Sequence, residues 1–322
     1  MSEPVIVAKD LVKYYKERGF FAGRKLALNR FNLEVNKGET VAVLGPNGAG
    51  KTTFLRIIFG LIYPSGGEIR VFGRTAEDIN WRVRAGYVPE FYNPARFLTA
   101  QELLEISART NGMSRKNFEK ALEWLEEKLG IKELLALRVR QFSRGMLQQL
   151  ALASALIHNP ELVVLDEPTA NLDALSRRKL KELLKELSGQ GKTILLSSHI
   201  LSEVEELCNK VVIIKNGQVI KQGSTEELLG REEGYLICFK APSQLPEQLD
   251  KLGAISMDAE RKIISLSVSD EYKKDLVVKV LSENNIPIEL LEPKQKTLEE
   301  YFLELTQQEA LEKYFLEIVK EQ

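Results

Sequence analysis

The chain has 322 residues, of which 44% are hydrophobic and 28% charged, and this composition and length suit a large globular domain plus a smaller one. Its 45 basic and 46 acidic side chains nearly cancel, so we expect no broad basic face for nucleic acid. The start lacks the pattern of a signal peptide, the longest apolar runs are far short of the ~20 residues of a membrane helix, and two cysteines, Cys208 and Cys238, favour a reducing cytosol.

Strand-like runs alternate with helical runs from the N-terminus to about residue 230. Three runs read as buried strands, each followed by a helical run: residues 40–45, 161–168 and 192–199. Residues 210–223 read as an antiparallel hairpin around Asn216-Gly217, a pair that accepts the positive φ angles of a tight turn. Because buried strands that alternate with helices form parallel sheets covered on both faces, residues 1–230 predict an α/β domain with a mostly parallel sheet and an antiparallel portion.

Two departures from this rhythm predict further organisation. Between about residues 90–160 the pattern is helical alone, which predicts a helical subdomain inserted in the α/β domain. Over residues 231–296 the order strand, helix, strand, strand, helix, strand is typical of a small ferredoxin-like α+β domain, with its first helix at 243–252. Residues 297–322 carry leucines and aromatics at helical spacing and predict a C-terminal helix.

The stretch "GPNGAGKTT" fits the phosphate-loop pattern G-x-x-x-x-G-K-[ST] between a strand and a helix. Glycines let the backbone N–H groups point at phosphate oxygens, and the helix adds its positive N-terminal end. Lys51 would reach the outer phosphates, and the Thr52 hydroxyl would bind Mg²⁺. The sequence context favours this interpretation over a glycine-rich turn without function. The predicted nucleotide-binding residues here are Gly45, Pro46, Asn47, Gly48, Ala49, Gly50, Lys51, Thr52 and Thr53.

Polar residues follow two later buried strands. "LVVLDEP" ends in Asp166, placed to hold Mg²⁺ through water, and Glu167, placed to orient or deprotonate an attacking water. His199 ends the strand "LLSSH", at the carboxyl edge where open α/β sheets bind ligands. A solvated acidic turn and a structural histidine are the alternatives, and the phosphate loop makes both less favourable. His158, in a loop, is expected to be structural.

The order of these motifs resembles the ATP-binding cassette of ABC transporters over about residues 5–225. The phosphate loop is followed by "FSRGM" with "ALASALIHNP", then by "LVVLDEPTANLD" and "LLSSH". The resemblance implies a P-loop NTPase fold that binds ATP and Mg²⁺. It also implies that Glu167 is the catalytic glutamate, that His199 is the γ-phosphate switch histidine, and that residues 170–173 form a dimer-contact loop.

Four further positions take roles from the same resemblance. Tyr15 aligns with the aromatic residue that stacks on adenine, with adjacent Tyr14 as the alternative. Ser143 and Gly145 match the signature motif, which implies a cap on the phosphates of a nucleotide held by a second subunit. The resemblance thus implies a head-to-tail dimer of this chain with a second copy of itself or with a paralogous cassette.

Three positions depart from the commonest cassette pattern. Glu90, in "GYVPE", stands where many members have a glutamine that touches the metal and the attacking water, so its role as a metal ligand is open. The signature reads Ser-Arg-Gly-Met rather than Ser-Gly-Gly-Gln, and about six extra residues after Tyr15 read as a surface hairpin. Together, "GYVPE" and "SRGM" resemble the branch of drug, sodium, lipid and polysaccharide exporters with separately encoded permeases.

The resemblance therefore implies an ATPase subunit of an exporter, cytoplasmic and peripheral on the inner face of the cell membrane through an integral membrane permease. The aromatics Phe91, Tyr92 and Phe97 are either permease anchors or core residues. A soluble cassette ATPase acting on ribosomes or nucleic acid stays open as the alternative, although this chain has one cassette and no heptad array. A regulatory binder without hydrolysis is expected to lack Glu167 or His199, and both are present.

Overall fold

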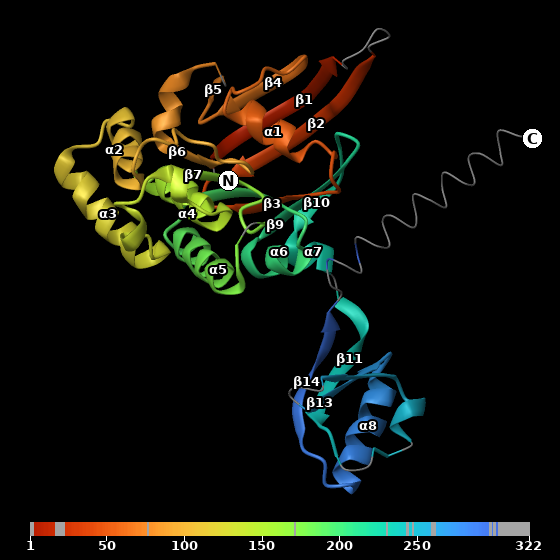
Figure 1. Cartoon of the computed structure of the whole chain (residues 1–322). Coiled ribbons are helices and arrows are strands. Elements are labelled where there is room, and N and C mark those ends of the chain that lie inside the picture. Colours follow the sequence, from red (N-terminus) through yellow and green to blue (C-terminus); the bar gives the residue numbers. More distant parts are fainter. Residues whose placement is uncertain are drawn as a thin grey trace, which may run out of the picture. The chain divides into compact units, whose positions relative to one another are not determined.

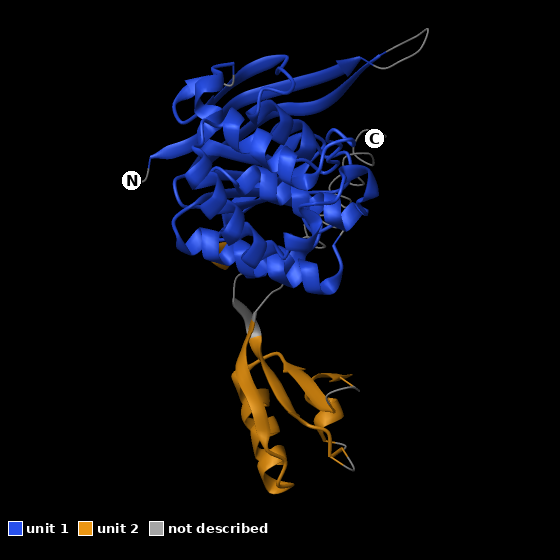
Figure 2. Cartoon of the chain, turned by 60° about the vertical axis from the view of Figure 1, so that its left-hand side comes forward, with its two compact units in different colours: residues 1–225 blue, residues 226–322 orange. Residues whose placement is uncertain are grey.

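The chain forms two compact units, residues 1–225 and residues 226–322, which Figure 2 colours separately. The computed structural model describes residues 3–16, 23–75, 77–170, 172–229, 231–242, 245–246, 248–258, 262–295, 298 and 301. The tip of the predicted surface hairpin and the predicted C-terminal helix, apart from Leu298 and Tyr301, lie outside the described residues.

The first unit is built on a mixed six-stranded sheet in the order β10-β9-β3-β8-β7-β6. Every neighbouring pair is parallel except β10 and β9, which form the predicted antiparallel hairpin around Asn216-Gly217. The strands are β3 (Thr40–Leu44), β6 (Ala85–Val88), β7 (Leu162–Asp166), β8 (Thr193–Ser198), β9 (Lys210–Lys215) and β10 (Gln218–Ser224). Every residue of β3, β7 and β8 is buried, as expected for parallel strands covered on both faces.

A second, antiparallel sheet lies beside the first, in the order β2-β1-β4-β5 (Figure 1). Its strands are β1 (Pro4–Lys16), β2 (Arg24–Asn36), β4 (Gly66–Val71) and β5 (Arg74–Thr75). Strands β1 and β2 pair as far as Lys16 and Arg24, so they form the arms of a long hairpin. Strand β1 also pairs with β4, more than fifty residues later in the chain.

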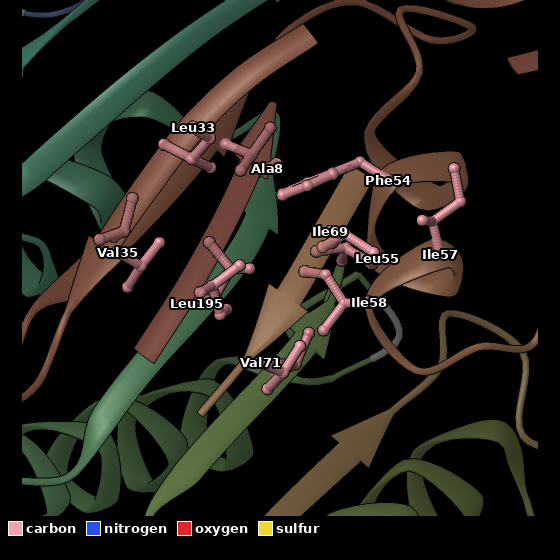
Figure 3. Close-up of a cluster of buried hydrophobic side chains, with 14 of the residues drawn as sticks. Ala8, Leu33, Val35, Phe54, Leu55, Ile57, Ile58, Ile69, Val71 and Leu195 are labelled. Carbon is pink, nitrogen blue, oxygen red and sulfur yellow. The ribbon is translucent and has the colours of Figure 1, made fainter. Parts of the chain in front are cut away.

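The core of this unit lies around helix α1 (Lys51–Ile58), between the two sheets. Figure 3 shows Phe54, Leu55 and Ile58 of α1 among side chains of the antiparallel sheet, with Leu195 of the parallel sheet nearby. Phe54 also contacts Phe31 at 4.4 Å between ring centroids. Four apolar residues within eight positions give α1 one buried face, so packing fixes the helix that follows the phosphate loop.

Helices α2 and α3 lie to one side of the parallel sheet, on the left in Figure 1. Residues 90–160 contain α2 (Ala100–Thr110), α3 (Arg115–Leu129), α4 (Arg144–Leu156) and the short 3₁₀ helices Lys132–Leu134 and Val139–Gln141. Helix α2 begins with a capping box: the Thr99 hydroxyl accepts the Glu102 N–H, and the Glu102 carboxylate accepts the Thr99 N–H. The remaining helices of the unit are η1 (Ile79–Arg84, a 3₁₀ helix), α5 (Ala174–Gly189), α6 (Leu201–Leu207) and, at its boundary, α7 (Thr225–Leu229).

The second unit is a four-stranded antiparallel sheet in the order β12-β13-β11-β14, the order of a ferredoxin-like fold. Its elements are β11 (Arg231–Lys240), the 3₁₀ helix Leu249–Lys251, β12 (Ala254–Asp258), β13 (Ile263–Val268), α8 (Glu271–Glu283) and β14 (Ile288–Gln295). The expectation of a helix over 243–252 is wrong for its described residues. After Pro246 only one 3₁₀ turn forms, because Gly253 and strand β12 follow at once.

Candidate functional site

The phosphate loop connects strand β3 to helix α1, and its glycines are required by the backbone. Gly50 has φ +111°, and a Cβ there would lie 2.5 Å from the Ala27 carbonyl oxygen. A Cβ on Gly45 would lie 2.3 Å from the Ile214 carbonyl oxygen. The turn of the β9–β10 hairpin supports the loop, because Gly217 N–H donates to the Ala49 carbonyl oxygen at 2.9 Å. The loop is thus fixed by neighbours from two other strands.

Lys51 is held inside this loop. Its side chain is 6% exposed, and Nζ donates to the Gly45 carbonyl oxygen at 2.7 Å. Nζ also lies 3.4 Å from Glu167 Oε1. An ammonium group bound to main-chain oxygens and to one carboxylate can exchange these partners for phosphate oxygens at small cost, because each partner is replaced by a stronger anionic one.

Glu167 and His199 are in contact. His199 Nδ1 lies 2.7 Å from Glu167 Oε2, so the ends of strands β7 and β8 meet there as predicted for parallel neighbours. Glu167 has φ +50°, a left-handed conformation that is rare for a residue with a side chain and that is concentrated at functional sites. The Glu167 side chain is only 10% exposed, whereas that of His199 is 56% exposed.

Asp166 lies at the bottom of the same region and is fully buried. Its Oδ1 accepts hydrogen bonds from Thr52 Oγ1 at 3.2 Å and from Ser197 Oγ at 2.7 Å. Burial raises the pKa of Asp166, and the two hydroxyl hydrogen bonds oppose that shift. Its Oδ2 is buried without a hydrogen-bond partner among the described residues. A buried carboxylate oxygen without a donor is costly and is satisfied by a metal ion or an ordered water.

A magnesium ion fits these residues. Hydroxyl and carboxylate oxygens are its preferred ligands, and Thr52 and Asp166 supply one of each next to the phosphate loop. Within the described ranges, no group of three or more acidic, histidine or cysteine side chains could hold a metal alone. Mg²⁺ is usually bound by one or two protein ligands, waters and substrate phosphates rather than by a protein cage, so this donor set suits it.

A cavity of about 560 Å³ opens over the loop. The predicted site residues that line it are Tyr15, Pro46, Asn47, Gly48, Ala49, Gly50, Lys51, Thr52, Thr53, Glu90, Glu167 and His199. Tyr15 reaches the loop, with its hydroxyl 3.4 Å from Thr53 Oγ1, whereas Tyr14 is absent from the described lining. Lys25 also lines the cavity because it pairs with Tyr15 across the β1–β2 hairpin.

Glu90 lines the cavity and interacts with two other acids, Asp166 and Glu167. Burial raises its pKa, and the negative charges of Asp166 and Glu167 raise it further. Arg56 opposes the shift in both Glu90 and Asp166, and Lys51 opposes it in Glu90. Together these side chains carry more negative than positive charge, so a bound cation would relieve the repulsion among the acids.

Ser143 and Gly145 lie apart from these residues, and neither appears in the described lining of the cavity. Ser143 is the N-cap of helix α4, and its Oγ accepts the Met146 N–H at 3.3 Å. The same helix contacts the Glu167 loop through buried Gln148, whose Nε2 donates to the Pro168 carbonyl oxygen. Helix α4 therefore couples the signature to the loop after β7.

Other predicted residues have simpler environments. Phe91 and Phe97 are 76% and 71% exposed, whereas Tyr92 is partly buried with its hydroxyl 3.3 Å from Ser154 Oγ. His158 Nε2 lies 3.1 Å from the Ala85 carbonyl oxygen, a structural contact. The sequence motifs do not predict Lys25 and Ala27, which line the cavity and carry no local signal. They also do not predict Ser197, whose signal is a hydroxyl in a wholly buried strand.

Fold and site together define a P-loop nucleotide hydrolase. A mostly parallel sheet carries a phosphate loop after β3, an Asp-Glu pair after β7 and a histidine after β8, all at one edge. Among the residues that the structure describes, no helix is both long enough and apolar enough to cross a membrane.

The family follows from comparison with known proteins. The family model described as ABC transporter matches residues 28–170. An uncharacterized ABC transporter ATP-binding protein of Synechocystis is 34% identical over 93% of this chain and 84% of that protein. The daunorubicin resistance ATP-binding protein of Streptomyces coeruleorubidus is 33% identical over 88% of this chain and 92% of that protein. The chain belongs to the ABC transporter family, as an ATP-binding subunit with ATPase activity.

Solved structures agree with this assignment. One described as the ATP binding subunit of an ABC transporter has a TM-score of 0.63 and 33% identity, covering 70% of this chain and 91% of that chain. A dimeric cassette bound to ADP and Pi in a post-hydrolysis state has a TM-score of 0.63 and 27% identity, covering 69% and 99% of the two chains. The prediction of a cassette fold is confirmed, and a soluble ATPase acting on ribosomes or nucleic acid is not favoured.

Proposed function

We propose that this chain is the ATPase of an exporter, in which two cassettes close head to tail around two ATP molecules and drive a separate membrane permease. The observation that carries the proposal is the contact of Glu167 with both His199 and Lys51 in the cavity over the phosphate loop. A base, a histidine and a phosphate-binding cation are thereby brought to one point of the cavity.

In this proposal the chain's own residues divide the work of hydrolysis. Lys51 and the loop N–H groups hold the phosphates, and Tyr15 packs against the adenine ring. Glu167 takes a proton from the attacking water. Before ATP binds, the hydrogen bond between Glu167 and His199 orients the carboxylate, and His199 then exchanges this bond for one to the γ-phosphate. The low exposure of Glu167 limits competing water, so a single water can be positioned.

Thr52 and Asp166 are the residues that would hold Mg²⁺, with Glu90 close to it. Mg²⁺, when bound, neutralises negative charge on the phosphates during transfer. Asp166 would contribute through Oδ2, which has no hydrogen-bond partner among the described residues, whereas the Thr52 hydroxyl donates to Oδ1 of the same carboxylate. Glu90 adds a third negative charge, beside Asp166 and Glu167, where a glutamine is commoner, which increases the dependence of ATP binding on the cation.

Dimer closure explains the separate position of the signature. The N-terminus of helix α4 presents Ser143 and Gly145 away from the chain's own cavity, and helix N-termini bind anions. The phosphate it would cap belongs to a nucleotide on the partner subunit, either a second copy or a paralogous cassette. The dimeric cassette among the similar structures supports the proposal that two cassettes associate.

The permease is proposed to dock beside the loop that carries Glu90. Phe91 and Phe97 expose most of their surface on this loop, although apolar side chains this large are normally buried. Aromatic side chains are enriched at the centres of protein interfaces, which suits a tight partner contact. Such docking would place the chain on the inner face of the membrane.

Export as the direction is supported by similar proteins. A relative from Cupriavidus pinatubonensis is named a Nod factor export ATP-binding protein, at 36% identity over 76% of this chain and 74% of that protein. A relative from Ralstonia nicotianae is named a Nod factor export ATP-binding protein, at 35% identity over 72% of this chain. With the "GYVPE" and "SRGM" motifs, these names favour the exporter branch.

Glu167→Gln tests the assignment of the base. The variant should bind ATP normally, form a stable ATP-dependent dimer and lose hydrolysis by about 10²- to 10⁴-fold, because the amide cannot accept a proton. Glu182→Gln is the matched control, since Glu182 forms a surface ion pair with Arg178 on α5. Hydrolysis by Glu167→Gln at the wild-type rate would show that another group is the base.

Ser143→Arg tests the partner contact. The long cation should block ATP-driven dimerisation, measured by light scattering, while leaving ATP binding to the single subunit intact. Ser114→Arg is the control, because Ser114 caps helix α3 with the same 3.3 Å hydrogen bond but is not in the signature. If the two variants dimerise equally, Ser143 acts only as a helix cap and has no role in the partner contact.

A further inference from the structure

A buried hydroxyl connects the two acids of the site. Ser197, on strand β8, is 0% exposed and lies directly opposite Asp166 in the register of β7 and β8. Its Oγ donates to Asp166 Oδ1 at 2.7 Å and accepts the Glu167 N–H at 2.9 Å. We propose that Ser197 is a positioning residue for ATP hydrolysis, which sets the metal-binding carboxylate and the general base with one hydroxyl.

The hydrogen bond that Ser197 donates to Asp166 determines which carboxylate oxygen remains available for a metal ion. Ser197 and Thr52 both donate to Oδ1, so that oxygen has its partners within the protein. Oδ2 has no partner among the described residues, so it is the oxygen that can bind a cation or a water of the cation. Without Ser197 the carboxylate could rotate about its last bond, and the cation would meet an unfixed ligand. Partners of this kind are worth about 10- to 100-fold in metal affinity.

The acceptor side fixes the backbone of Glu167. With φ +50°, Glu167 has a strained backbone conformation, which persists only when its surroundings hold it. The hydrogen bond from Glu167 N–H to Ser197 Oγ is buried and stabilises this backbone conformation. This conformation turns the side chain so that its two oxygens reach His199 and Lys51. A shift of the backbone would move the base away from both.

Another hydroxyl on the same strand serves the fold without serving the site. Thr193, at the opposite end of β8, is 1% exposed, and its Oγ1 accepts the Gly38 N–H at 2.9 Å. Burial and the backbone hydrogen bond are thus matched between Thr193 and Ser197. Ser197 differs in its second bond, to a carboxylate of the site. This difference lets a functional role be separated from a contribution to stability.

The test compares Ser197→Ala with Thr193→Val in the full-length protein, with the Mg²⁺ dependence of ATPase activity as the main measurement. Ser197→Ala should need about 10- to 100-fold more Mg²⁺ for half-maximal activity. At saturating Mg²⁺ its kcat should stay about 10- to 100-fold low, because the base is misplaced. Metal-free binding of a fluorescent ATP analogue should be unchanged. Thr193→Val should change thermal stability alone, and Ser197→Thr, which keeps the hydroxyl, should recover most of the activity.

Several results would overturn the inference: wild-type Mg²⁺ dependence and kcat in folded Ser197→Ala, the same changes in Thr193→Val, or no recovery in folded Ser197→Thr. If Ser197→Thr does not fold, the comparison of the other two variants decides. The inference rests on the proposed roles of Asp166 and Glu167, and Glu167→Gln in the same assay separates the two. An inactive Glu167→Gln with a normal Ser197→Ala refutes the positioning role alone, whereas an active Glu167→Gln refutes the proposed base.

Discussion

Gly86→Ala should destabilise the first unit, because a helix passes directly over this glycine. A Cβ at Gly86, in strand β6, would lie 2.1 Å from the Ala155 carbonyl oxygen and 2.9 Å from its carbonyl carbon, both in the backbone of α4. Backbone atoms cannot turn aside as a side chain can, so α4 or β6 must shift. Overpacking of this kind costs about 1–3 kcal/mol. For a unit of this size that is a fall in Tm of roughly 2–12 °C, measured by thermal unfolding of the wild type and the variant.

Gly189→Ala is the matched control for this prediction. Gly189 ends helix α5, has an ordinary φ, and a Cβ there would meet nothing within 4 Å. Alanine is the better helix former by about 1 kcal/mol in a helix interior, so this variant should be as stable as the wild type or slightly more stable. The reasoning is refuted if Gly86→Ala unfolds at the wild-type temperature, or if both glycine variants lose stability equally.

Two further predictions concern titrating groups. Glu90→Gln should tighten ATP binding in EDTA by about 2- to 10-fold, since it removes a negative charge from the cavity. The pKa of Glu90 is raised, mainly by burial, so the ATP affinities of the two proteins should converge at acid pH and diverge as the wild-type carboxyl ionises. Equilibrium dialysis with ATP at a series of pH values checks this. Burial lowers the pKa of His158, so the unfolded chain binds its proton first and stability falls as pH drops below about 6.5. His158→Gln should show a shallower fall in unfolding free energy between pH 7 and pH 5, and parallel curves would contradict this.

The phosphate loop was predictable because its chemistry is local. Consecutive residues of "GPNGAGKTT" contain the glycines, the lysine and the hydroxyl, and a strand before and a helix after complete the pattern. The structure adds reasons from elsewhere in the chain. Gly45 and Gly50 are crowded by Ile214 and Ala27, neither of which any local pattern connects to the loop.

The meeting of Glu167 and His199 was also predictable, for a topological reason. Parallel strands end at the same edge, so residues that follow neighbouring buried strands come together there. The sequence could not provide the 2.7 Å contact or the left-handed backbone of Glu167. Both depend on strand register, which is set by side-chain packing over the whole sheet.

The antiparallel sheet could not be derived in detail. Strand β1 pairs with β2 beside it but also with β4, whose residues lie far along the chain and carry no pairing signal. The sequence pattern predicts a helix over residues 243–252, whereas its described residues form only the 3₁₀ turn Leu249–Lys251, because strand β12 follows at once. Lys25 entered the cavity wall only through its pairing with Tyr15.

By itself, the sequence determined the class of fold, the phosphate loop and the acidic pair, because each is written in contiguous residues whose types are dictated by backbone geometry and phosphate chemistry. Tertiary structure alone decided which atoms face one another. Within the described part of the chain, it left one oxygen of Asp166 without a donor, placed the Ser197 hydroxyl between two acids, and separated Ser143 from the cavity of its own chain. The physical reason is that a buried hydrogen bond depends on distances of a few tenths of an ångström, which strand register and packing set and local sequence does not.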